Sequence, residues 1–180
     1  MFELLIVLTI ALMTLISGRD HPLLVIITTI ILLPGLYALK TGAPYIPSSK
    51  ETLRRMMRLA KIKKGDSVYD LGCGDGRLVF ASTKAGARAV GYELSPPTFL
   101  YAKVRSLFHP GSRIAFKNFW SQDYSNADVI FCYLLTSTMQ SFKERIWPNL
   151  KPGCRVVSHA FKMLDVPVTE QEENVVVYVK

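Results

Sequence analysis

The chain has 180 residues, a formal net charge of +8 and an apolar content of 49%. This length suits one folded domain with a short additional segment. The three cysteines are far apart and form no C-x-x-C pair, which argues against a disulfide framework or a cysteine-based zinc site, and we expect no metal.

Two apolar runs, residues 2–16 and 23–39, open the chain and are separated by a polar turn. As helices they would span about 22 and 26 Å, close to the roughly 30 Å of a hydrocarbon core. We therefore predict a transmembrane helical hairpin that forms a membrane anchor over residues 1–39. One spanning helix with one interfacial helix, or two buried soluble helices, stay open as alternatives. A cleaved signal peptide fits poorly because Glu3, and no cation, precedes the first run.

Residues 40–64 carry eight Lys or Arg residues against one Glu, a net charge of +7. The positive-inside rule predicts that the chain from residue 40 onward is cytoplasmic, at a cell membrane with the lipid bilayer as partner. Because the basic excess directly follows the apolar runs, membrane topology explains it better than nucleic acid, and we expect no nucleic-acid partner. This part is predicted to be a proline-stiffened linker followed by a helix over 52–62, capped by Ser48 or Ser49. Its basic face could contact lipid headgroups or solvent.

Short apolar strands alternate with amphipathic helices through residues 65–180, the predicted catalytic domain. This pattern predicts an α/β fold with a doubly wound, mostly parallel, Rossmann-like sheet. A ligand of such a sheet lies at the carboxyl ends of its strands. The expected strands are 67–71, 87–93, 113–117, 128–134, 155–160 and 174–179, and the expected helices are 77–85, 97–108 and 137–150.

The most informative motif is Asp-Leu-Gly-Cys-Gly-Asp-Gly-Arg at residues 70–77, between a predicted strand and a predicted helix. Its G-x-G-x-G spacing, with an Asp in front, differs from the G-x-G-x-x-G of dinucleotide folds. A second acid, Glu93, closes the next apolar strand. This combination resembles the cofactor loop of class I S-adenosylmethionine-dependent methyltransferases.

The resemblance implies S-adenosyl-L-methionine as cofactor. Asp70 would take its amino end and Glu93 its ribose hydroxyls. Asn118 would lie near the adenine amino group, with Asp123 as the alternative. The cofactor-binding residues implied in this way are Asp70, Gly72, Cys73, Gly74, Glu93, Asn118 and Phe119.

A narrower resemblance covers residues 42–160. The Pro-Tyr-x-Pro element at 44–47, the glycine loop, Gly-Tyr-Glu-Leu-Ser-Pro at 91–96 and Tyr-Leu-Leu at 133–135 look like the ATP synthase c-subunit lysine methyltransferase family and its prokaryotic relatives. This resemblance implies a protein-lysine N-methyltransferase whose protein substrate lies near the membrane. Tyr45 and Tyr133 are then candidates for the wall of the substrate channel, since aromatic faces attract cations. Either tyrosine could equally be structural.

Two features limit the transfer of the acceptor, and a third counts against methylation of base amino groups. Asn118 stands where the family pattern suggests an acid, and the chain is short after the fifth strand. The region after the fourth strand lacks the Asn/Asp-Pro-Pro-aromatic tetrad of enzymes that methylate base amino groups. Methylation of a small molecule or lipid, and a non-enzymatic cofactor-binding module, remain alternative functions. His159 receives no role.

Overall fold

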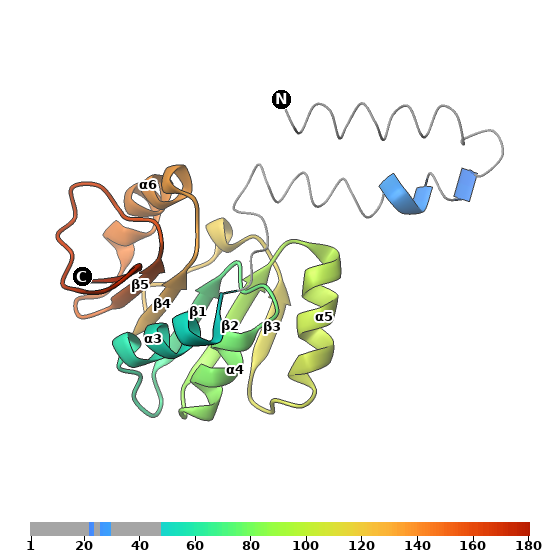
Figure 1. Cartoon of the computed structure of the whole chain (residues 1–180), viewed down its shortest axis with the longest axis horizontal. Coiled ribbons are helices and arrows are strands. Elements are labelled where there is room, and N and C mark those ends of the chain that lie inside the picture. Colours follow the sequence, from blue (N-terminus) through green and yellow to red (C-terminus); the bar gives the residue numbers. More distant parts are fainter. Residues whose placement is uncertain (1–21, 24–25, 30–47) are drawn as a thin grey trace.

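The computed structural model describes residues 22–23, 26–29 and 48–180 (Figure 1). Most of the predicted hairpin, the linker and Tyr45 lie outside the described residues. Within those ranges, no helix is both long enough and apolar enough to cross a membrane.

The described chain forms a seven-stranded sheet in the order β3-β2-β1-β4-β5-β7-β6. The first five strands are parallel, β7 runs antiparallel to β5, and β6 runs antiparallel to β7. The predicted doubly wound, mostly parallel sheet is confirmed, with strand ends within three residues of expectation. The strands are β1 Ser67–Leu71, β2 Arg88–Glu93, β3 Arg113–Phe116, β4 Val129–Cys132, β5 Arg155–His159, β6 Glu170–Glu172 and β7 Val175–Val179.

Helices cover both faces of this sheet, as Figure 1 shows. On one face, α3 (Lys50–Ala60) packs on β5 and β7, α4 (Arg77–Lys84) on β1 and β2, and α5 (Pro96–Ser106) on β3. On the other face, α6 (Thr136–Arg145) and the short 3₁₀ helices η1 (Phe119–Ser121) and η2 (Trp147–Asn149) close a second apolar cluster.

One predicted helix, 137–150, is interrupted. In the structure α6 ends at Arg145 and η2 follows. Pro148 explains the break, because its nitrogen carries no hydrogen and its ring collides with the preceding turn of an α-helix.

Strand β7 illustrates why the sheet is buried on both faces. Val175 and Val177 belong to the cluster under α3, α4 and α5, whereas Val176 and Tyr178 belong to the cluster under α6. All four side chains are almost fully buried. A strand covered on both faces is apolar throughout, which is the pattern seen in the sequence.

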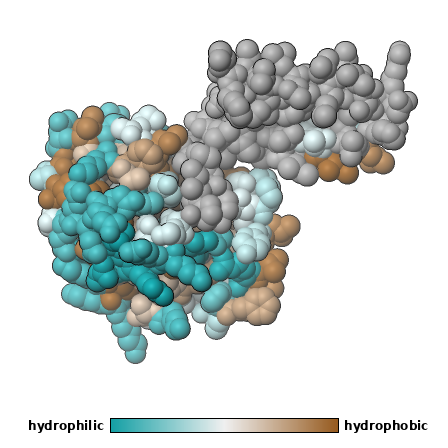
Figure 2. All heavy atoms as spheres, viewed as in Figure 1, coloured by the Kyte–Doolittle hydropathy of each residue, from teal (hydrophilic) through white to brown (hydrophobic). Residues whose placement is uncertain are grey.

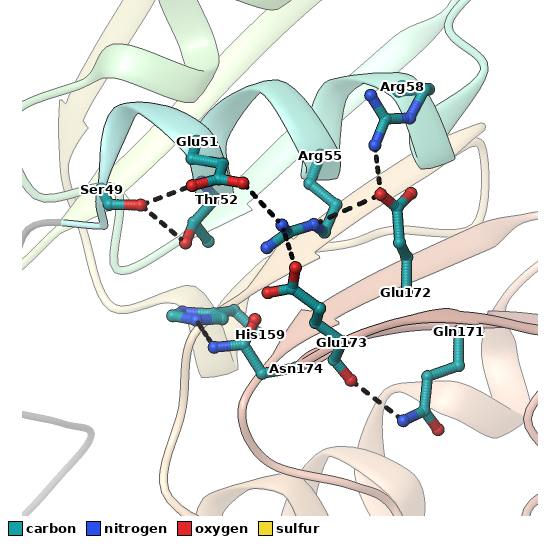
Figure 3. Close-up of polar contacts among 10 residues, drawn as sticks. All are labelled: Ser49, Glu51, Thr52, Arg55, Arg58, His159, Gln171, Glu172, Glu173 and Asn174. Atoms are coloured by element: carbon teal, nitrogen blue, oxygen red, sulfur yellow. Dashed lines mark hydrogen bonds and ion pairs between the residues drawn. The ribbon is translucent and has the colours of Figure 1, made fainter.

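The basic face of α3 is occupied by the acidic β6–β7 hairpin (Figure 3). The Arg55 side chain is only 6% exposed, and its guanidinium lies 2.7 Å from a carboxylate oxygen of Glu173 and 3.1 Å from one of Glu51. Arg58 pairs with Glu172. Lys61 pairs with Glu170 at 2.7 Å, although Lys61 lies one residue beyond the helix. For Arg55 the expected contact with lipid or solvent is therefore wrong, whereas Arg58 and Lys61 pair with acids of the hairpin and stay largely exposed. Ser49, rather than Ser48, caps the helix by accepting a hydrogen bond from the Thr52 backbone N–H.

We predict that Arg55→Ala lowers the free energy of unfolding by about 2 kcal/mol, because a buried side chain and its charged hydrogen bonds are lost together. Arg58→Ala is the matched control: it removes the same kind of side chain from the same helix, but one that is 62% exposed. It should have a small effect that disappears at high salt. Urea unfolding of the full chain measures both, and equal losses would contradict the predicted role of burial.

Candidate cofactor and acceptor site

The glycine loop lies where β1 ends, at the carboxyl edge of the parallel strands. The backbone N–H groups of Gly72 and Cys73 both donate to the Tyr92 carbonyl oxygen, at 3.0 and 2.9 Å, which fastens the loop to the end of β2. Gly72 and Gly74 have φ of 77° and 56°, a left-handed conformation that glycine adopts without a steric penalty. A Cβ built on Gly72 would have no neighbour within 4 Å, so the loop leaves open space for a ligand.

Glu93 stands beside this loop. One carboxylate oxygen accepts from Gly74 N–H at 3.0 Å, and the other accepts from the N–H groups of Leu94 and Ser95 at 2.8 and 2.7 Å. Partial burial raises the pKa of Glu93, while these three donors act in the opposite direction. The carboxylate is thereby fixed at the end of β2, where the ribose role predicted for it would require it to be.

Asp70 is buried, and within the described residues no hydrogen bond reaches its carboxyl group. Burial, reinforced by the charges of Glu93 and Asp75, raises the pKa of Asp70 to about 8. A buried acid that lacks a partner is stabilised in its ionised form by a cation brought next to it. The predicted contact with the amino group of a cofactor fits this environment.

Asp75, the second acid of the motif, has a different role. Its carboxylate accepts two hydrogen bonds from the Arg77 guanidinium, both at 2.8 Å, a longer one from the Arg77 backbone N–H at 3.4 Å, and one from Arg105 on α5. Arg105 also donates to the Asp75 carbonyl oxygen at 2.9 Å. Burial alone would raise the pKa of Asp75, but the two guanidinium groups outweigh it and lower that pKa. Asp75 therefore holds the loop in place rather than facing a ligand.

The residues after β3 are engaged in local turns. The Asn118 side-chain oxygen accepts from Trp120 N–H at 3.0 Å and so caps η1, while Phe119 is buried. The carboxylate of Asp123 accepts from the backbone N–H and the hydroxyl of Ser125. Roles for Asn118 and Phe119 toward adenine stay predictions, and the geometry gives Asp123 no advantage over Asn118.

Tyr133 and His159 meet at the carboxyl ends of β4 and β5. Their rings are 4.2 Å apart between centroids, and Phe161 stacks on Tyr133 at 6.3 Å. The His159 Nε2 atom lies 2.9 Å from the Asn174 side-chain nitrogen, whereas its buried Nδ1 atom has no hydrogen-bond partner in the part of the chain that the structure describes. Burial and the charge of Arg55 lower the pKa of His159, which favours a neutral ring.

His159, to which the sequence assigns no role, is the last residue of β5 and lies next to the strand that Tyr133 follows, because the ends of neighbouring parallel strands lie side by side. Tyr45, the other candidate for the channel wall, lies outside the described residues.

The family model for the ANTKMT methyltransferase domain matches residues 70–170, more than half of the chain. The chain belongs to this methyltransferase family. The match starts at Asp70 and spans Glu93, Tyr133 and His159, so it includes both parts of the site described above.

Curated relatives agree with this assignment. A protein-lysine N-methyltransferase of Saccharolobus islandicus is 38% identical over 125 residues, which cover 67% of this methyltransferase and 78% of that protein. The lysine N-methyltransferase of Rattus norvegicus that is named for the ATP synthase c-subunit is 27% identical over 138 residues, or 75% of this chain and 62% of that protein. The predicted family resemblance is confirmed.

Solved structures identify the cofactor. An RNA methyltransferase from Salinibacter ruber in complex with S-adenosyl-L-homocysteine has a TM-score of 0.68 and 32% identity, covering 74% of this chain and 92% of that chain. An S-adenosylmethionine-dependent methyltransferase from Geobacter sulfurreducens, also with S-adenosyl-L-homocysteine, shares the fold with a TM-score of 0.52 at 22% identity. The cofactor of this methyltransferase is S-adenosylmethionine, as predicted.

Cofactor binding should release a proton near pH 7. With its pKa raised to about 8, the Asp70 carboxyl of the free protein is mostly protonated at that pH, and a cationic amino group beside it would ionise it. Affinity should therefore rise from pH 6 to 7.5 as less work is needed to remove the proton. Titration calorimetry in buffers of different ionisation enthalpy measures this release. Asp70→Asn should bind more weakly and release no such proton, and an unchanged release would exclude Asp70 as its source.

Proposed function

We propose that this chain is a membrane-attached methyltransferase that transfers a methyl group from S-adenosylmethionine to the side-chain nitrogen of a protein lysine. The observation that carries the proposal is the placement of an aromatic and a neutral histidine at the strand ends beside the glycine loop. The name of the archaeal relative, a protein-lysine N-methyltransferase, supports the choice of acceptor.

Membrane attachment is part of this proposal. Its support is the pair of apolar runs in residues 1–39, followed by a segment with a net charge of +7. The positive-inside rule then orients the catalytic domain toward the cytoplasm, where we place its substrates.

The acceptor site would have to receive a lysine as a neutral amine, although its ordinary pKa is about 10.4. When bound, S-adenosylmethionine supplies a methyl group on a positively charged sulfur atom. The Tyr133 ring would attract the arriving ammonium group. Neutral His159 adds no repelling charge, and removal of the lysine from water at a partly buried site favours loss of its proton. Positioning the nitrogen in line with the methyl group then provides much of the rate.

Incubating membranes that contain this protein with radiolabelled S-adenosylmethionine tests the proposal. Label should appear in a protein band as methyl-lysine by mass spectrometry, and Glu93→Ala should abolish it. Label confined to lipid or to small molecules would reject a protein acceptor. Cofactor binding without transfer to any fraction would reject an enzyme.

An RNA acceptor is the second candidate, favoured by one observation. The Salinibacter ruber protein, which is 32% identical and is matched over 92% of its length, is described as an RNA methyltransferase. Nuclease treatment separates the two candidates, because label in RNA is lost with nuclease while label in methyl-lysine is retained.

We predict that His159→Ala lowers kcat/KM for the protein acceptor by roughly tenfold or more while leaving the affinity for S-adenosylmethionine unchanged. The reason is that His159 ends β5, and β4 separates this strand from β1, which leads into the glycine loop. His109→Ala is the matched control, since that imidazole is exposed and stacks on Phe80 instead. A parallel loss of cofactor affinity in His159→Ala would place this residue in the cofactor site and contradict the assignment.

A further inference from the structure

An apolar patch covers the outward side of α5. Five large side chains between Leu100 and Phe108 are more than half exposed, and Figure 2 shows apolar residues gathered along this flank of the molecule. Leu100, Tyr101 and Val104 lie on the side of α5 that faces away from the buried Ala102, and Leu107 and Phe108 continue the patch just beyond the end of the helix at Ser106. The members of this α5 patch are Leu100 (62% exposed), Tyr101 (58%), Val104 (51%), Leu107 (75%) and Phe108 (77%).

The surroundings of the α5 patch are positively charged. Between Glu93 and Asp123 the sequence contains no acidic residue. It contains four cations in that stretch, of which Arg105 is bound to Asp75. The other three, Lys103, Arg113 and Lys117, are exposed and form no ion pair with any described residue. On α3, by comparison, Arg55 and Arg58 are paired with acids of the β6–β7 hairpin.

This combination selects one kind of partner. Aliphatic and aromatic side chains bordered by unpaired Lys and Arg are typical of helices that lie in a membrane interface and contact anionic headgroups. A second copy of the chain fits less well, since a symmetric contact through this patch would bring the same unpaired cations face to face. Apolar clusters of this size on the surface of a folded domain commonly mark a protein or membrane contact.

We propose that α5 is a second membrane contact of this methyltransferase, with the α5 patch inserted among lipid headgroups and Lys103, Arg113 and Lys117 paired with anionic lipid. The helix starts three residues after Glu93, and Arg105 fastens it to the cofactor loop. Docking of α5 would therefore fix the orientation of the carboxyl strand ends relative to the bilayer. This membrane contact involves only residues 94–122, and it can form whichever group the enzyme methylates.

The test uses a single environment-sensitive label on the full chain in vesicles. The three native cysteines are buried, so Leu107→Cys can be labelled selectively with the fluorophore NBD. Leu164→Cys is the matched control, because Leu164 is also an exposed leucine (58%) but lies in the loop between β5 and β6. In vesicles of phosphatidylcholine with one quarter phosphatidylglycerol, we expect a blue-shifted emission at position 107 and quenching by brominated lipid, and neither effect at position 164.

A second experiment removes positive charges next to the α5 patch. Arg113→Gln and Lys117→Gln should each reduce the ratio of docked to undocked α5 by roughly fivefold in these vesicles, and by much less in phosphatidylcholine alone. Affinity for S-adenosylmethionine, measured by calorimetry, should stay the same in both variants, which separates this inference from the proposed catalytic function. Equal quenching at positions 107 and 164, or none at 107, overturns the proposal. A blue shift at position 107 that depends on protein concentration and is insensitive to brominated lipid would overturn the proposal in favour of self-association.

Discussion

The buried carboxylate of Asp75 holds the cofactor loop in its conformation. A loop with glycines at alternate positions has little conformational preference of its own, so its shape must be imposed by contacts. Arg77 reaches Asp75 from the first turn of α4, and Arg105 reaches it from the last turn of α5. Arg77 also donates to the Ser48 carbonyl oxygen at 2.5 Å, just before α3. Asp75 is thus connected to α4 and α5 directly and to the start of α3 through Arg77. These contacts hold the loop around the open space at Gly72.

Charge organises the rest of the domain in a similar way. The sequence shows one basic block, residues 40–64, and invites a single explanation for it. In the structure, Arg55, Arg58 and Lys61 of this block are matched by acids of the β6–β7 hairpin, which joins the first helix of the domain to the last hairpin. Lys50, Arg54, Lys63 and Lys64 of the same block form no ion pair among the described residues, and neither do Lys103, Arg113 and Lys117 near α5 and β3.

Much of the fold could be predicted from the sequence because it follows from local patterns. The strand–loop–helix order around Asp70 and the acid that ends β2 are separated by few residues, so this short stretch carries the resemblance to methyltransferases that implies the cofactor. Strand β6 could not be predicted, since Glu-Gln-Glu shows no apolar alternation and is held by its pairing with β7. The partners of Arg55 and the contact between Tyr133 and His159 join positions far apart in the chain, and no local pattern encodes them. The acceptor side of the site is accordingly the part for which the sequence was least informative.

The pairing of α3 with the β6–β7 hairpin also has a consequence for biosynthesis. Arg55 leaves the ribosome more than one hundred residues before Glu172 and Glu173, the acids that surround it. At about 5–20 residues per second, roughly ten seconds of translation separate the two events. During that interval Arg55 has only Glu51 of its own helix as a partner, so α3 cannot adopt its buried position before the last hairpin is available. The domain therefore completes its folding only after nearly all of this sequence has been synthesised.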